Sequence, residues 1–146
     1  MAKVSPLPLR ALCALLVDDD PDVRETTREA LEQLGLVVAE ASHGLEAIQM
    51  FKADAWRPDL AVLDYNMPLM NGLDTLRALR SFQPDLPAIL CSGSIGPDTL
   101  RESGLDRMVL LPKPFRLADL TQALVESLDS RAPRFLGSDQ RYWTFP

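Results

Sequence analysis

The stretch LLVDDDP, residues 15–21, decides the fold, because an apolar run ends there in three consecutive carboxylates. A short continuous apolar run of this kind is typical of a strand that is buried on both faces, as in a parallel sheet. Asp20 and Pro21 suit an N-cap and a first helical residue, so a helix is expected to follow at once. The stretch therefore predicts a buried strand, an acidic turn and a helix in direct succession.

The same alternation continues along the chain as far as about Leu128. Further apolar runs predict four more strands, at residues 36–41, 59–64, 87–92 and 108–111, with helical spacing between them and after the last one. The helix that follows Gly96 and Pro97 is expected to be short. Five strand–helix units in strict alternation favour an α/β fold with a parallel sheet and helices on both faces.

Length and composition limit the class of protein. A chain of 146 residues suits one domain, which we place at residues 10–130, with a leader at 1–9 and a tail at 131–146. The net charge of −6 argues against direct nucleic-acid binding, and no apolar stretch is long enough to cross a membrane. Cys13 and Cys91 lie in apolar runs and are expected to be buried thiols in a reducing compartment. We expect a cytoplasmic protein without a targeting signal.

Polar side chains stand where four of the expected strands end. Asp18 and Asp19 follow the first strand, Asp64 the third, Ser92 the fourth and Lys113 the fifth. In a parallel sheet these strand ends meet at one edge, where ligands bind. Carboxylates gathered there repel one another unless a cation compensates their charge. Because the ligand set is rich in carboxylate oxygen, with neither cysteine at a strand end, magnesium is the expected cation.

These residue types are sufficient for phosphoryl transfer onto a carboxylate. Asp64 can act as a covalent nucleophile and form an acyl phosphate. A magnesium ion beside it would spread the charge of the transferring group. Lys113 offers a fixed positive charge, and the Ser92 hydroxyl can donate a hydrogen bond to a phosphoryl oxygen. The sequence thus predicts Asp64, Ser92 and Lys113 as the reactive set.

Four motifs in order make the chain resemble the response-regulator receiver domain of two-component signalling. They are LLVDDDP at residues 15–21, VLDYNMP at 62–68 with Asn71-Gly72 after it, LCSG at 90–93 and PKPF at 112–115. The resemblance covers roughly residues 10–130. It implies a flavodoxin-like (βα)5 three-layer sandwich with a five-stranded parallel sheet in the order 2-1-3-4-5.

The resemblance also implies a role for each site residue. Asp64 would be the phosphoacceptor and Asp19 a direct magnesium ligand, with Asp18 binding directly or through water. The Asp64 carboxylate and the backbone carbonyl of Asn66 would complete the protein ligands, and Mn²⁺ could substitute for Mg²⁺. Ser92 would be the switch hydroxyl.

The lysine motif carries two further expectations. By the resemblance, Lys113 would contact the phosphoryl group, and the peptide bond between Lys113 and Pro114 would be cis. The family commonly has Tyr or Phe three residues before this lysine, whereas this chain has Leu110. Leu cannot make the same edge contact or hydrogen bond, so we expect the output surface to change less on phosphorylation, or by another route.

The implied partners are a histidine kinase or histidine phosphotransfer protein, which would donate the phosphoryl group from phosphohistidine. The chain would be an acceptor with slow self-dephosphorylation rather than an enzyme, a monomer or weak dimer, and would act through a downstream protein. The alternative is a phosphohydrolase of the haloacid-dehalogenase type, with Asp18 as nucleophile and Asp20 as the second acid. A domain used only for binding is a third possibility.

The tail, residues 131–146, belongs to none of these motifs. It contains Phe135, Tyr142, Trp143 and Phe145, although flexible linkers are normally poor in aromatic residues. Three roles stay open for it: docking on its own domain, binding a partner, or leading into a longer architecture.

Overall fold

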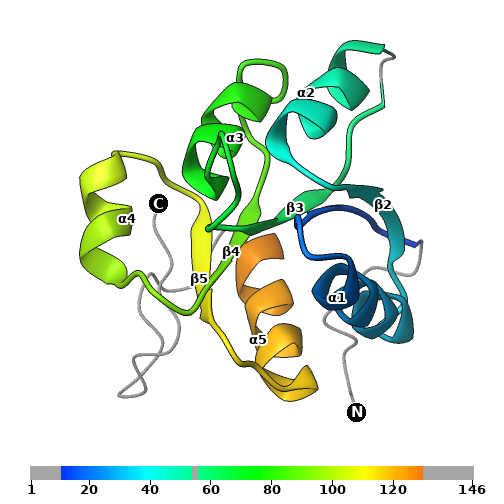
Figure 1. Ribbon diagram of the computed structural model, residues 1–146. Helices are drawn as coiled ribbons and strands as arrows, with labels where there is room; N and C mark the ends of the chain where they lie inside the picture. The colour runs from blue at the N-terminus through cyan, green and yellow to red at the C-terminus, as the bar shows by residue number, and fades with distance from the viewer. Residues whose placement is uncertain (1–10, 54–55, 130–146) are drawn as a thin grey trace.

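The computed structural model describes residues 11–53 and 56–129, so the leader and tail predictions lie outside the described residues (Figure 1). Five strands alternate with five helices, as predicted. The strands are β1 (Cys13–Val17), β2 (Val37–Ala41), β3 (Leu60–Asp64), β4 (Ala88–Ser92) and β5 (Met108–Pro112). The helices are α1 (Pro21–Gln33), α2 (Gly44–Ala53), α3 (Gly72–Arg80), α4 (Pro97–Ser103) and α5 (Leu117–Leu128).

The strands form one parallel sheet in the order β2-β1-β3-β4-β5, which confirms the predicted topology. Alternate side chains of each strand enter opposite faces of the sheet, as strand geometry requires. In β3, for example, Ala61 and Leu63 pack with the cluster under α2, α3 and α4, whereas Leu60 and Val62 pack with the cluster under α1 and α5. The molecule is therefore a three-layer sandwich (Figure 1).

Local signals set the ends of the helices. The Asp20 side chain accepts hydrogen bonds from the backbone N–H groups of Asp22 and Val23, and so caps α1 as predicted. Gly35, just beyond α1, adopts a φ of 98°, a conformation that favours glycine. The α4 helix has only 7 residues, which confirms that the fourth helix is short. Its one fully buried side chain is Leu100.

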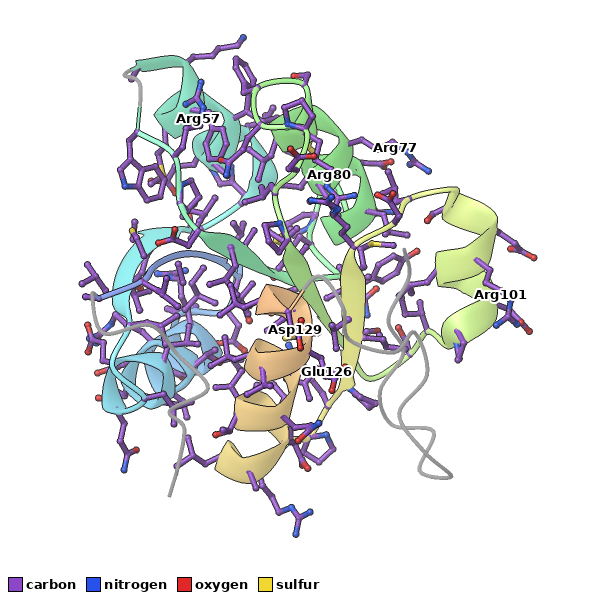
Figure 2. The ribbon with its side chains drawn as sticks, turned by 180° about the vertical axis from the view of Figure 1, so that it is seen from behind. Arg57, Arg77, Arg80, Arg101, Glu126 and Asp129 are labelled. Carbon is purple, nitrogen blue, oxygen red and sulfur yellow. The ribbon has the colours of Figure 1, made fainter. Side chains whose placement is uncertain are left out.

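The amino-terminal edge of the sheet is tied together by an arginine. Arg80, at the end of α3, points toward the segment before β5 (Figure 2). Its guanidinium donates to the carbonyls of Leu86, Asp106 and Arg107 at 2.7–3.1 Å. These acceptors lie just before β4 and β5, so one side chain fixes the entry of two strands. Among the described residues, no helix has the length and apolar content to cross a membrane.

Candidate functional site

Three carboxylates gather at the carboxyl-terminal edge of the sheet, as the strand ends predicted. Asp18 follows β1 and Asp64 ends β3, and the two strands are neighbours in the sheet. Oxygen atoms of Asp18, Asp19 and Asp64 all lie within 4.8 Å of one another. Asp18 and Asp64 are buried, with 4% and 8% of their surface exposed, while Asp19 is open to solvent. The cluster thus has two inner acids and one at the rim.

Lys113 approaches this cluster from the end of β5. Its Nζ donates a hydrogen bond to Asp64 Oδ1 at 2.7 Å and lies 3.7 Å from Asp18 Oδ2. The Lys113 backbone N–H is bonded to the Ser92 carbonyl, which keeps the lysine in line with β4. The peptide bond between Lys113 and Pro114 is cis, as the resemblance implied.

The pKa values of this group reflect burial first and the neighbouring charges second. Burial raises the pKa of Asp18, as do the nearby charges of Asp64 and Asp19, while the backbone N–H of Asp20 opposes the rise. Burial likewise raises the pKa of Asp64, although the hydrogen bond from Lys113 acts in the other direction. Burial alone would lower the pKa of Lys113, but the bond to Asp64 and the two carboxylate charges outweigh it, so the pKa rises. One ammonium does not compensate three carboxylates.

The donor set has the chemistry that a hard divalent cation requires. The clustered donors are carboxylate oxygens, two of them on buried residues. Neither cysteine belongs to this cluster: Cys91 is buried, as expected, whereas Cys13, which was also expected to be buried, is only half-buried. Burial raises the pKa of the Cys91 thiol to about 12, so it is a protonated core side chain, as expected. Magnesium is held in proteins by one or two carboxylates together with waters, which matches a half-open cluster of this composition.

Ser92 lies at the end of β4 and is buried, with 2% of its surface exposed. Its hydroxyl oxygen accepts hydrogen bonds from the backbone N–H groups of Ser94 and Ile95, at 3.0 and 3.2 Å. The Asn66 side chain, from the β3–α3 loop, donates to the Ser94 hydroxyl at 2.9 Å. The Ser94 hydroxyl is in turn 3.3 Å from that of Ser92. Ser94 therefore links the two loops beside Asp64, a role that sequence reasoning missed.

Two more residues shape the site without having been predicted. Arg24, on α1, donates to the backbone carbonyl of Asp18 at 2.7 Å and pairs with Glu40 of β2 at 3.2 Å. It thereby holds the acidic turn between β1 and α1 next to β2. Gly72 packs against the β3 end so closely that a Cβ there would lie 2.6 Å from the Asp64 carbonyl oxygen. The spacing of the Asn71-Gly72 motif does not predict this contact.

Leu110 sits in β5 beside Leu90 of β4 and is 2% exposed. It packs into the cluster on the α2–α4 face of the sheet. The position that usually carries an aromatic ring is thus filled by a buried aliphatic side chain. The expectation about a smaller or different readout concerns the phosphorylated protein and stays a prediction.

Comparison with known proteins decides the family. Residues 14–125 match the family model of the response regulator receiver domain. The chain belongs to this family. Response regulator MprA of Mycobacterium ulcerans is 43% identical over 110 residues, which cover 73% of this chain and 45% of that protein. Response regulator MprA of Mycobacterium tuberculosis is 42% identical over the same length, covering 46% of that protein. The chain spans about half the length of these curated relatives.

Solved structures of receiver domains share the fold. The response regulator receiver protein from Sinorhizobium medicae superposes with a TM-score of 0.75 at 28% identity, over 85% of this chain and 99% of that one. Chemotaxis response regulator CheY4 of Vibrio cholerae gives 0.70 at 29% identity, over 82% and 100%. The phosphohydrolase alternative has no support, and Asp20, its required second acid, is used to cap α1.

Proposed function

We propose that this receiver domain takes a phosphoryl group onto Asp64 from a phosphohistidine, in a magnesium-dependent step of a phosphorelay. The observation that carries the proposal is the pairing of the buried Asp64 carboxylate with Lys113, beside the acids Asp18 and Asp19. A structural ion pair would not need two further acids within 4.8 Å. Such a surplus of negative charge is costly in the resting protein and useful only with a cation and a phosphoryl group.

The side chains of Asp18, Asp19 and Asp64, with the backbone carbonyl of Asn66, would hold Mg²⁺, or Mn²⁺ in its place. When bound, the ion would neutralise the carboxylates and stabilise negative charge on the transferring phosphoryl oxygens. Arg24 would keep the acidic turn in place through the Asp18 carbonyl. The raised pKa values of Asp18 and Asp64 support this assignment, because a cation would relieve the repulsion that contributes to them.

The transfer would proceed by attack of an Asp64 carboxylate oxygen on phosphorus. The phosphorus–nitrogen bond of the phosphohistidine breaks, its electron pair stays on the imidazole, and an acyl phosphate forms on Asp64. Lys113, which holds Asp64 Oδ1 in the resting state, would turn its ammonium to a phosphoryl oxygen. The Ser92 hydroxyl would leave the N–H groups of Ser94 and Ile95 and donate to another oxygen.

The finer biological statements follow from this reaction. The donor would be a histidine kinase or histidine phosphotransfer protein in the cytoplasm, and the domain would be a monomer or weak dimer. Its output would be a protein contact rather than catalysis, with hydrolysis of the acyl phosphate slow. Phosphorylation acts in such domains by adding charge that biases a two-state surface.

Acetyl phosphate provides a direct test without a partner protein. We expect incubation with acetyl phosphate and Mg²⁺ to add one phosphoryl group, which intact-mass spectrometry detects and peptide mapping assigns to Asp64. Removing the metal should abolish the product, and Mn²⁺ should restore it. Asp64→Asn should abolish labelling, while Asp74→Asn, which changes an exposed acid on α3, should not. Labelling that survives in Asp64→Asn would refute the proposal.

A further inference from the structure

The face of the sheet covered by α1 and α5 carries an apolar groove. The two helices lie side by side (Figure 1), and a groove of about 730 Å³ runs between them. Val23 and Ala30 line it from α1, and Phe115, Leu117 and Leu120 line it from the other side. Its volume is in the range of sites that hold compact apolar ligands. Leu117 is 41% exposed and adds apolar surface to the groove.

We propose that residues 130–146 of this chain dock in the α1–α5 groove. The aromatic composition of this segment favours its burial. These 17 residues hold four of the nine aromatic side chains of the protein, Phe135, Tyr142, Trp143 and Phe145. Aromatic side chains gain more from burial than any others, because each removes a large apolar area from water.

The segment is also long enough to reach the groove. α1 and α5 both follow parallel strands on the same face, so they run in the same direction and the segment leaves α5 at the Gln33 end of the groove. Leu120 lies nine residues before Asp129, which is about 14 Å along a helix. Phe135 lies six residues beyond Asp129, which allows about 20 Å of extended chain. The first aromatic residue therefore reaches Leu120, and the later ones reach the Lys113 end.

The charge of the segment is also opposite to that of the rest of the chain. The segment contains three arginines and one aspartate, which gives it a net charge of +2. Residues 1–129 carry a net charge of −8, so that the whole chain has −6. Asp22 and Glu29 lie on the α1 wall of the groove. The basic residues of that helix are already engaged: Arg24 pairs with Glu40, and Arg28 pairs with Glu32 and Glu40. Lys113 and Arg116 line the opposite wall, but they are paired with Asp64 and Asp119, so the two acids of the α1 wall would attract a basic segment.

Trp143 reports docking directly in the full chain. With Trp56→Phe as background, Trp143 is the sole tryptophan, and its emission and acrylamide quenching measure its exposure. We expect a blue-shifted, shielded Trp143 in dilute protein. Glu29→Lys should lower the docking constant roughly two- to fivefold, as loss of an exposed charge pair does. Glu25→Lys makes the same change on α1 outside the groove lining and should leave quenching unaltered.

An apolar pair of variants tests the same idea independently. Leu117→Lys should expose Trp143, whereas Leu45→Lys, at a residue 48% exposed on α2, should not. If Leu117→Lys fails to fold by circular dichroism, the Glu29 and Glu25 pair decides alone. The inference is overturned if Trp143 is as quenchable as in denaturant, or if the groove and control variants behave alike. Shielding that disappears on dilution would also overturn it, because the segment would then occupy a second copy. None of these readouts depends on phosphorylation of Asp64.

Discussion

The two edges of the sheet both bury charged groups, but they treat them in opposite ways. At the amino-terminal edge, Arg80 has a side chain only 9% exposed, and its donors are met by the Leu86, Asp106 and Arg107 carbonyls. At the carboxyl-terminal edge, Asp18 and Asp64 are buried beside each other, and Lys113 compensates only part of their charge. At the amino-terminal edge the buried charge is fully hydrogen-bonded, whereas at the carboxyl-terminal edge two buried carboxylates repel each other.

This difference separates stability from function along the strands. A buried charge that is fully hydrogen-bonded fixes its surroundings, and removing it leaves several acceptors without partners. A buried charge beside a like charge destabilises the resting fold and gains its partner only in the functional state. The comparison predicts that removing the buried charge of Arg80 at one edge and of Asp18 at the other changes stability with opposite sign.

The largest effect is expected at the amino-terminal edge. Arg80→Ala should lower the free energy of unfolding by about 3 kcal/mol, because the Leu86, Asp106 and Arg107 carbonyls lose their donor. Arg77→Ala is the matched control on the same helix, since Arg77 is 47% exposed, pairs with Asp74 and donates to one backbone carbonyl, that of Ser103, instead of three. It should cost less than about 1 kcal/mol. Urea denaturation measures both, and equal losses would show that Arg80 has no special structural role.

Gly72 tests the contact between the β3 end and α3. Gly72→Ala places a Cβ 2.6 Å from the Asp64 carbonyl oxygen and from Leu90 Cδ1, so the loop after Asp64 has to shift. We expect a loss of about 2 kcal/mol, as overpacking typically gives, and slower labelling by acetyl phosphate. Gly96→Ala is the control, because a Cβ there meets nothing within 4 Å. Unchanged labelling in Gly72→Ala would show that the Asp64 position tolerates the shift.

What the sequence could predict follows the same division between the edges. The strands and the gathering of Asp18, Asp64 and Lys113 follow from apolar runs and from parallel strands ending at one edge, whereas the strand order was implied only by the family resemblance. The Arg80 contacts could not be predicted, because they join residues 6 to 27 positions apart through backbone carbonyls, which have no residue signature. The same holds for the bond from Arg24 to the Asp18 carbonyl. Side-chain reach and orientation decide such contacts.

At the carboxyl-terminal edge, removing a charge should stabilise the metal-free protein. Asp18→Asn removes a buried carboxylate whose pKa is raised by burial and by Asp64, while an oxygen remains for the Asp20 N–H. We expect a gain on the order of 1 kcal/mol at neutral pH. Because its pKa is raised, Asp18 takes up a proton in the folded state before it does so in the unfolded state, so the gain should fade as pH falls through the folded value and be gone below the unfolded one. Glu25→Gln, an exposed acid on α1, is the control.

Mg²⁺ should reverse the order of stability of the parent protein and Asp18→Asn. Mg²⁺ is expected to raise the stability of the parent by binding the folded state, and to raise that of Asp18→Asn much less. Thermal melts with and without Mg²⁺ measure the difference. A parent that Mg²⁺ does not stabilise, or a variant that gains equally, would remove Asp18 from the ligand set.

The smallest effect concerns a carboxylate at the same edge that is satisfied. Glu46, in the first turn of α2, accepts hydrogen bonds from the Ser42 backbone N–H at 2.6 Å and from its hydroxyl at 2.8 Å. These bonds lower the pKa of Glu46, the reverse of Asp18. Its ionised form therefore stabilises the fold above the unfolded pKa, and this contribution is lost as pH falls through the folded value. Glu46→Gln should cost about 0.5–1 kcal/mol at neutral pH.

The pH dependence of this loss identifies its cause. If the charge-assisted bonds from Ser42 stabilise the fold, the difference between parent and Glu46→Gln should shrink toward zero in acid, where both side chains are neutral. Asp18→Asn and Glu46→Gln should then show differences of opposite sign at neutral pH that converge at low pH. A Glu46→Gln loss that stays constant across the acid range would instead reflect packing. In that case the hydrogen bonds from Ser42 would not explain why Glu46 stabilises the fold while Asp18, at the same edge, does not.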